Sequence, residues 1–216
     1  MTRMIGLGAG GHATVVIDIL RHDASNELVG LLDSNRALHG TEVAGVPVLG
    51  GDDLLQGLRS NGVTHAFIGL GCSGDARPRA RLYTAAVAAG FEPVAAIHPK
   101  ATVSSAARLG RGATIMPGAI VNAGARLGDN VIVNSGAIVE HDCAIGHHAH
   151  IATGASLASA VEVGEGAHIG VGAAIRQCIR IGRYAQVGAG AVVVRDVAEG
   201  VIVVGVPARV LKAVQA

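Results

Sequence analysis

Aromatic residues are nearly missing from this chain of 216 residues, and tryptophan is absent altogether. Phe67, Tyr83, Phe91 and Tyr184 are the only phenylalanine and tyrosine residues, although 50% of the residues are hydrophobic. An ordinary core fills much of its volume with such rings. The apolar surface must therefore be buried by thin aliphatic side chains on closely spaced backbone. Single-stranded nucleic acid is a poor partner, because stacking platforms are missing.

Other features are scarce too, and each scarcity excludes a class of protein. The net charge is +1, so no broad cationic surface for nucleic acid or for an anionic membrane is expected. No uncharged apolar run approaches the roughly 20 residues of a membrane helix, and the N-terminus lacks the apolar stretch of a signal peptide. Cys72, Cys143 and Cys178 form no CxxC pair. We therefore expect a cytoplasmic protein with reduced thiols and no membrane insertion.

A repeat of six residues runs through the second half of the chain. Every sixth position from Val103 to Val193, sixteen in all, holds Val, Ile or Leu. Four residues after each lies a second series, from Ala107 to Val197, with alanine at eleven of sixteen positions. Period six fits a β-helix of hexapeptide repeats, a triangular prism with a short strand on each face. Eighteen residues then make one coil, and the aliphatic side chains point inward.

The first half follows a different pattern. Strands are predicted over residues 3–7, 27–32 and 64–70, and helices over residues 12–20 and 75–89. This alternation predicts a small parallel α/β domain of the Rossmann-like kind. The predicted domains are therefore residues 1–96, α/β, and residues 97–216, the β-helix with a short C-terminal tail. A helix is one option for that tail.

A glycine loop follows the first predicted strand. Gly6, Gly8 and Gly11 satisfy G-x-G-x-x-G between a strand and a helix, and Asp33 ends the second strand. Such a loop brings backbone close to phosphate at a helix N-terminus, and the carboxylate suits a ribose hydroxyl. The alternative is that the glycines only permit a sharp turn. A domain of this size holds about half of a dinucleotide fold, so a mononucleotide or nucleotide sugar fits better than NAD.

Histidines gather between residues 141 and 150. His141 lies two residues after the inward Val139 and should point outward, where Asp142 can orient its ring as a general base requires. A solvated surface histidine is the alternative. His150 lies eighteen residues before His168, so the two should stack, and stacked histidines could hold zinc as in γ-class carbonic anhydrases. A third ligand is not evident from the sequence.

The whole chain resembles a known family through several motifs. They are Gly8-Ala9-Gly10-Gly11-His12, Leu32-Asp33-Ser34, Ile97-His98-Pro99, the run from Val133 to Gly146, and Gly205-Val206-Pro207-Ala208. Together they are similar to the bacterial nucleotide-sugar O/N-acetyltransferases, exemplified by sialic acid O-acetyltransferases and the UDP-bacillosamine-pathway N-acetyltransferase. The resemblance implies a left-handed β-helix, acetyl-CoA as cosubstrate, no metal, and homotrimers with active sites between subunits.

The same resemblance implies roles for single residues. His141 matches the general base and Asp142 its acidic partner. His150 matches a residue beside the acetyl-CoA thioester, and Val171 and Ala189 match positions whose backbone holds the pantetheine arm. The implied contacts to the nucleotide sugar are six: Gly10, Gly11, His12, Asp33, Ser34 and Gly71.

The sequence thus predicts an enzyme that moves acetyl from acetyl-CoA to the 4-amino group of a nucleotide-linked dideoxyamino sugar. The resemblance favours GDP-perosamine, and hence a place in lipopolysaccharide O-antigen biosynthesis. No cysteine is placed for a covalent relay, since Cys143 occupies an alanine position of the repeat. Three alternatives stay open: a sugar or sialic acid O-acetyltransferase, a γ-carbonic-anhydrase-like zinc enzyme, and a non-catalytic solenoid that binds nucleotide sugar.

Overall fold

The computed structural model describes residues 1–214 of the chain. It divides into two compact units. The first combines Met1–Gly71 with Pro78–His98, and the second combines Cys72–Arg77 with the chain from Pro99 onward. Among the described residues, no helix has the length and apolarity needed to cross a membrane.

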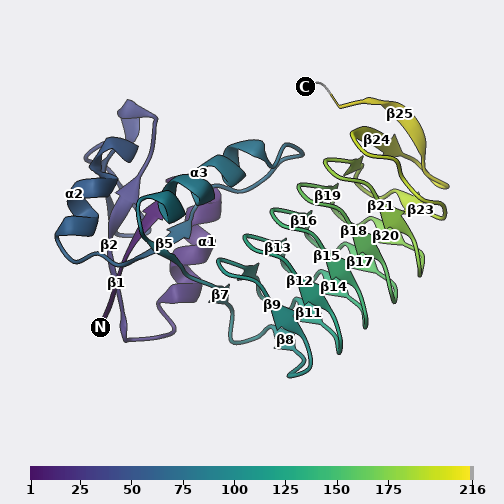
Figure 1. Cartoon of the computed structure of the whole chain (residues 1–216), viewed down its shortest axis with the longest axis horizontal. Coiled ribbons are helices and arrows are strands. Elements are labelled where there is room, and N and C mark those ends of the chain that lie inside the picture. Colours follow the sequence, from purple (N-terminus) through teal and green to yellow (C-terminus); the bar gives the residue numbers. More distant parts are fainter. Residues whose placement is uncertain (215–216) are drawn as a thin grey trace. The chain divides into compact units, whose positions relative to one another are not determined.

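The first unit is built on a six-stranded sheet with strand order β3-β4-β2-β1-β5-β6, and Figure 1 labels its strands β1, β2 and β5. All neighbouring strands are parallel except β3 and β4. The strands of this unit are β1 (Thr2–Leu7), β2 (Asn26–Leu32), β3 (Glu42–Val43), β4 (Val46–Gly50), β5 (His65–Ile68), β6 (Glu92–Pro93) and β7 (Ala96–Ile97). The helices are α1 (Gly11–Leu20), α2 (Leu55–Ser60), α3 (Arg77–Ala88) and the 3₁₀ turns η1 (Arg36–Leu38) and η2 (Asp52–Leu54). The predicted α/β alternation is confirmed, whereas β3, β4 and α2 were not predicted.

Three of the four aromatic side chains lie in this unit and are buried there. Phe67, Tyr83 and Phe91 are at most 7% exposed, and the last two pack with Ile5 and Leu32. The inner strands β1 and β5 are buried over most of their length. A parallel sheet covered on both faces requires such continuous apolar strands.

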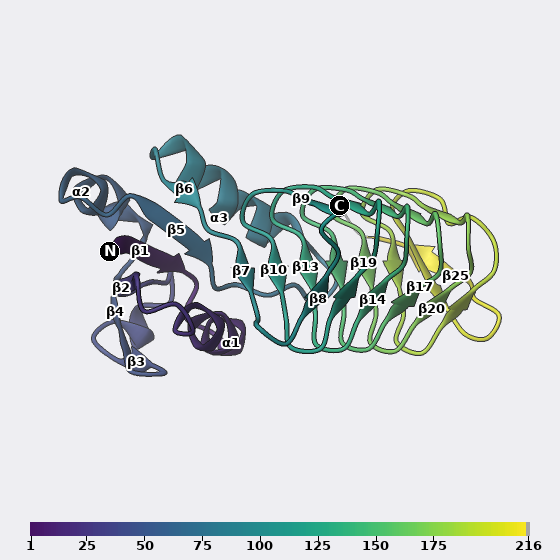
Figure 2. The same ribbon diagram turned by 90° about the horizontal axis from the view of Figure 1, so that it is seen from below.

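The second unit is a triangular prism of three sheets whose coil strands are parallel, a left-handed β-helix as expected (Figure 2). The first sheet holds β10 (Thr114–Ile115), β13 (Ile132–Val133), β16 (His150–Ile151), β19 (His168–Ile169), β22 (Gln186–Val187), β24 (Val201–Val204) and β25 (Arg209–Ala213). The second sheet holds β8 (Thr102–Val103), β11 (Ile120–Val121), β14 (Ile138–Val139), β17 (Ser156–Leu157), β20 (Ala174–Ile175) and β23 (Val192–Val193). The third sheet holds β9 (Arg108–Leu109), β12 (Arg126–Leu127), β15 (Ala144–Ile145), β18 (Glu162–Val163) and β21 (Arg180–Ile181).

The register confirms a coil of eighteen residues. Val133 pairs with Ile151, and Ile151 pairs with Ile169. The aliphatic and alanine series share one interior core, in which Ile151 and Ala149 are both fully buried. Because alanine occupies the second series, successive coils stack without the ring volume that the chain lacks.

At each turn from one face of the prism to the next, one residue has a positive φ, in the left-handed backbone region. These residues recur every six positions from Gly112 to Gly190. Eight of the fourteen are glycine, which adopts positive φ at little cost, and the others are Asn130, Asp142, His148, Ala160, Cys178 and Tyr184. This third series is not evident from the sequence, because its non-glycine members share no side-chain type.

The C-terminal tail forms a strand, not the helix that was one of the options predicted from the sequence. After β24 the chain turns through Gly205 and returns as β25, which pairs antiparallel with β24. Val210 and Leu211 on β25 are exposed. The tail is therefore an edge strand of the first sheet, and the helical option is wrong.

Candidate active site

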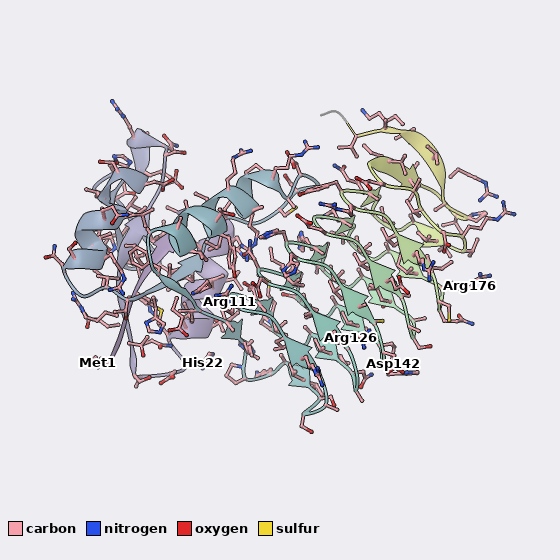
Figure 3. All side chains as sticks on the ribbon, viewed as in Figure 1. Met1, His22, Arg111, Arg126, Asp142 and Arg176 are labelled. Carbon is pink, nitrogen blue, oxygen red and sulfur yellow. The ribbon has the colours of Figure 1, made fainter. Side chains whose placement is uncertain are left out.

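His141 and Asp142 form a hydrogen-bonded pair at a corner of the prism, after β14. His141 Nδ1 lies 2.8 Å from Asp142 Oδ2, and both side chains are more than half exposed. The outward orientation predicted for His141 is therefore confirmed, and Figure 3 labels Asp142 at the edge of the prism. Because a carboxylate only accepts hydrogen bonds, Nδ1 donates to Asp142, and Nε2 is the ring nitrogen that this contact leaves available to a substrate.

The local fold holds this pair in place through residues that the sequence analysis did not assign. Asp142 has φ +61°, a conformation that Asp tolerates better than most residues. The Glu140 carboxylate accepts hydrogen bonds from the backbone N–H of His141 at 3.2 Å and from Asn122 Nδ2 at 3.0 Å. A side chain at Gly124 would place its Cβ 2.5 Å from Asp142 Oδ1. Gly124 therefore leaves the space that the Asp142 carboxylate occupies.

His150 lies on the first sheet and is only 6% exposed. Its Nδ1 is 2.8 Å from the backbone carbonyl of Cys72, and its Nε2 is 3.2 Å from Asn134 Nδ2. The predicted stacking is confirmed: His150 pairs with His168 in the register, and their ring centroids are 4.9 Å apart. Cys72 approaches the same two rings. Cys72 lies 78 residues before His150 in the chain, so this contact could not be predicted from the sequence.

Val171 and Ala189 occupy equivalent corners of successive coils, and both are exposed. The carbonyl of Val171 accepts a hydrogen bond from Gly190 at 2.8 Å, which ties the two coils together. The N–H groups of Val171 and Ala189 donate to no other group in the described part of the chain. Such N–H groups on exposed residues can bind the amide carbonyls of an extended ligand.

One chain does not bring these groups together at one corner. His141 and Asp142 follow a strand of the second sheet, whereas Val171 and Ala189 follow strands of the first sheet. A groove of about 640 Å³ runs over the third sheet, lined by Arg126, Glu162 and Arg180 among others, and contains none of the predicted site residues.

Cys143 packs inside the prism. It is fully buried, its thiol donates to the Ala158 carbonyl at 3.3 Å, and burial raises its pKa. A buried thiol of raised pKa is a poor nucleophile. The interpretation of Cys143 as a packing residue is confirmed.

In the first unit, the predicted substrate residues gather at the carboxyl ends of β1, β2 and β5. Gly8 follows β1 with φ +98°, and a Cβ there would lie 2.8 Å from the backbone nitrogen of Leu70. Gly10 is the N-cap of α1 and Gly11 its first residue, and a Cβ at either would meet nothing within 4 Å. The helix N-terminus is therefore open, as a phosphate site requires.

Asp33 fixes the glycine loop. Its Oδ2 accepts the N–H of Ala9 at 2.8 Å, and its Oδ1 accepts the N–H of Asn35 at 2.8 Å. The sequence predicts that this carboxylate faces a ribose hydroxyl. In the structure each oxygen already has a backbone donor, although each retains a further lone pair. Ser34 beside it is exposed.

His12 and Gly71 also meet in this region. A Cβ at Gly71 would lie 3.3 Å from Cβ of His12, so the two positions are in contact. Arg79 on α3, which the sequence analysis missed, is 1% exposed and donates to the carbonyls of Ile68 at 3.0 Å and Leu70 at 2.6 Å. Its Nη1 lies 3.5 Å from His12 Nε2. A buried arginine thus holds the end of β5 beside the glycine loop.

Carboxylates concentrate at the same edge of the sheet. Burial raises the pKa of Asp52, and the negative charges of Asp33 and Asp53 raise it further. This negative edge suits the N–H and O–H donors of a nucleoside, while the helix N-terminus suits its phosphates.

Comparisons with known proteins agree with both units. The family of the PglD N-terminal domain matches residues 4–86, and the bacterial transferase hexapeptide family (six repeats) matches residues 106–140. No curated protein sequence matches.

Solved structures match nearly the whole chain. PerB from Caulobacter crescentus, in complex with CoA and GDP-perosamine, is 42% identical with a TM-score of 0.90 over 96% of each chain. The acetyltransferase domain of PglB from Neisseria gonorrhoeae, in complex with acetyl coenzyme A, is 37% identical with a TM-score of 0.87 over 97% of this chain and 99% of that chain. WeeI from Acinetobacter baumannii is 27% identical with a TM-score of 0.85 over 98% and 100%.

Identity of this level over the full length establishes the family and confirms the resemblance. The chain belongs to the bacterial hexapeptide-repeat acetyltransferases that include perosamine N-acetyltransferase from Caulobacter crescentus.

Proposed function

We propose that this protein transfers the acetyl group of acetyl-CoA to the 4-amino group of a nucleotide-linked dideoxyamino sugar, with GDP-perosamine as the favoured acceptor. The observation that carries the proposal is the His141–Asp142 contact of 2.8 Å at an exposed corner. Its relatives add the substrate class, since one is in complex with CoA and GDP-perosamine and another with acetyl coenzyme A.

In the proposed reaction, the neutral amine attacks the thioester carbonyl and forms a tetrahedral intermediate. His141 Nε2 takes the proton that the amine loses, while Asp142 holds Nδ1–H and stabilises the imidazolium. The C–S bond then breaks, and the thiolate of CoA recovers a proton from His141. General-base help of this kind is worth roughly 10²–10⁴-fold, and positioning of the two substrates contributes at least as much.

Acetyl-CoA would lie along the corner of Val171 and Ala189, whose N–H groups can bind its pantetheine amides. Its thioester would reach His150. The nucleotide sugar would lie at the edge of the first unit, with phosphate over Gly10 and Gly11 and the nucleoside toward Asp33, Ser34, Gly71 and His12.

The separation of His141 from the acetyl-CoA corner supports a homotrimer in which each active site lies between two subunits. In that arrangement one subunit supplies His141 and Asp142, and its neighbour supplies Val171 and Ala189. A cyclic trimer contains three identical contacts of this kind.

The test is release of free CoA thiol from acetyl-CoA in the presence of GDP-, UDP- and dTDP-linked amino sugars. We expect one 4-amino sugar to react, and His141→Asn to lower kcat by about 10²-fold or more. His147→Asn is the matched control, because His147 is another exposed corner histidine whose Nδ1 accepts the N–H of Asp129 at 2.9 Å. Reaction only with the hydroxyl of sialic acid or another sugar, or no effect of the His141 substitution, would contradict the proposal.

A further inference from the structure

Three metal-binding side chains from distant parts of the sequence converge in the second unit. One ligand atom each from Cys72, His150 and His168 lies within 4.8 Å of the others. Cys72 belongs to the same compact unit as the two histidines, and its thiol takes part in no disulfide. None of the three has a role in holding the prism core, which is formed by the aliphatic and alanine series.

His168 is suited to ligate a metal rather than to carry a charge. Its Nδ1 is buried and has no hydrogen-bond partner among the described residues. Burial also lowers the pKa of His168 below its ordinary value. A neutral imidazole keeps a lone pair, which is the form that binds a cation. A buried ring nitrogen without a partner is costly, and a bound cation would satisfy it.

His150 is held so that one ring nitrogen can ligate while the other remains anchored. Its Nδ1 faces the carbonyl of Cys72 at 2.8 Å, and its Nε2 faces the amide of Asn134 at 3.2 Å. A ligating nitrogen gives up one of these hydrogen bonds and keeps the other. Metal-bound histidines nearly always keep such a second partner, which fixes the ring.

The donor set and the spacing favour zinc. Two imidazoles and a thiolate are ligands that Zn²⁺ prefers, in tetrahedral geometry with an open fourth position. Zinc–ligand bonds of about 2.0–2.3 Å place tetrahedral donors roughly 3.4–3.6 Å apart. The three donors here lie within 4.8 Å of one another, so any pair needs to close by at most about 1.4 Å. Rotation of the partly exposed Cys72 side chain can supply much of this movement.

We propose that Cys72, His150 and His168 bind one Zn²⁺ ion, and that this ion inhibits the enzyme by withdrawing His150 from acetyl-CoA. The thiol of Cys72 loses its proton to solvent when the metal binds, and no electron transfer is involved. The inhibition rests on the proposed function, whereas the zinc site does not. Zinc here is not required for acetyl transfer.

The zinc site is tested with the full-length protein and Zn²⁺ in the absence of acetyl-CoA. We expect one equivalent to bind, and Cys72→Ser to weaken the affinity by at least about 100-fold. Serine keeps the backbone carbonyl that faces His150. Cys178→Ser is the matched control, because Cys178 is an exposed thiol elsewhere on the prism, and it should bind zinc as the parent does. Replacement of zinc by Co²⁺ should give a thiolate-to-cobalt absorption band that Cys72→Ser abolishes. Less than stoichiometric binding, or equal affinity in Cys72→Ser, overturns the site.

The inhibition is tested by titrating zinc at increasing acetyl-CoA. Competition predicts that the apparent Kd for Zn²⁺ rises linearly with the concentration of acetyl-CoA, and that zinc inhibits the parent but not Cys72→Ser. Stoichiometric zinc binding that acetyl-CoA leaves unchanged overturns the inhibition and keeps the site. Protein that binds zinc but no acetyl-CoA overturns the proposed function, and the inhibition with it, while the zinc site stands.

Discussion

At the scale of single residues, burial of His168 makes stability depend on pH. Burial lowers the pKa of the folded histidine, while the unfolded chain has the ordinary value of about 6.5. Below that pH the unfolded state takes up a proton that the folded state does not. The stability is therefore fully present above pH 6.5 and is lost as the pH falls toward the folded pKa.

His168→Gln should remove this dependence. We expect Tm of the parent to fall between pH 7 and pH 5 by more than Tm of the variant, measured by thermal unfolding without metal. His147→Gln, on an exposed corner, should follow the parent. Parallel curves for the parent and His168→Gln would contradict the assignment.

Alanine substitutions at two glycines of the loop should have different effects, one on the stability of the fold and the other on binding of the nucleotide sugar. Gly8 has φ +98°, and its Cβ would lie 2.8 Å from the nitrogen of Leu70, so Gly8→Ala should destabilise the fold. Gly10 has an ordinary φ of −89°, and its Cβ would meet nothing. We therefore expect Gly10→Ala to fold with an unchanged Tm and to raise KM for the nucleotide sugar alone. An unchanged KM would favour the alternative that this glycine only shapes a turn.

At the scale of elements, the corners of the prism position the candidate catalytic pair. Gly124 and Gly136 both have positive φ, +74° and +66°, so alanine at either position costs about 1 kcal/mol of backbone strain. A Cβ at Gly136 meets nothing, whereas a Cβ at Gly124 lies 2.5 Å from Asp142 Oδ1. Both variants should lose similar stability, and only Gly124→Ala should displace the Asp142 carboxylate from His141.

The measurement is kcat against Tm for the two variants. Gly124→Ala should lower kcat by about 10-fold or more, and Gly136→Ala should keep the parent value. An equal decrease in both would mean that the corner affects activity through stability and not through Asp142.

The elements that sequence could predict are those with a strong period. The six-residue repeat of aliphatic side chains predicted the prism and its coil of eighteen residues. The same spacing predicted that His150 stacks on His168. The glycine loop and the α/β alternation located the first unit. The short hairpin of β3 and β4, helix α2 and strand β25 were missed, because two to six residues carry little periodic signal.

Within the candidate site, contacts between neighbours in the sequence could be predicted, whereas contacts between distant residues could not. His141 and Asp142 are adjacent in sequence, so their contact could be anticipated. Cys72 reaches His150 across 78 residues, and no spacing rule connects them. Two further contacts depend on the direction of a side chain, which the sequence does not reveal. They are the hydrogen bonds that the Asp33 carboxylate accepts from two backbone N–H groups, and the approach of the Asp142 carboxylate to Gly124.

At the scale of the whole molecule, the two candidate half-sites on one prism give a way to test whether subunits share an active site. The pair of His141 and Asp142 and the pair of Val171 and Ala189 occupy different corners. Suppose that each active site combines the histidine pair of one subunit with the Val171 and Ala189 pair of its neighbour. A subunit with a damaged first pair and a neighbour with a damaged second pair can then still form one intact site. If one subunit supplied both pairs, no mixture of two damaged subunits could contain an intact site.

This difference gives a quantitative prediction for mixed oligomers. His141→Ala removes one half-site, and Ala189→Trp blocks the other with a bulky side chain at an exposed position. Co-expressed in equal amounts and assembled at random, the two variants should form intact sites at about one quarter of all subunit contacts. We therefore expect about a quarter of parental kcat per site from the mixture and none from either variant alone. Mass measurement of the purified mixture verifies that the oligomers contain both chains. Mixed oligomers without activity would contradict the proposed arrangement, in which one subunit supplies His141 and its neighbour supplies the corner of Val171 and Ala189.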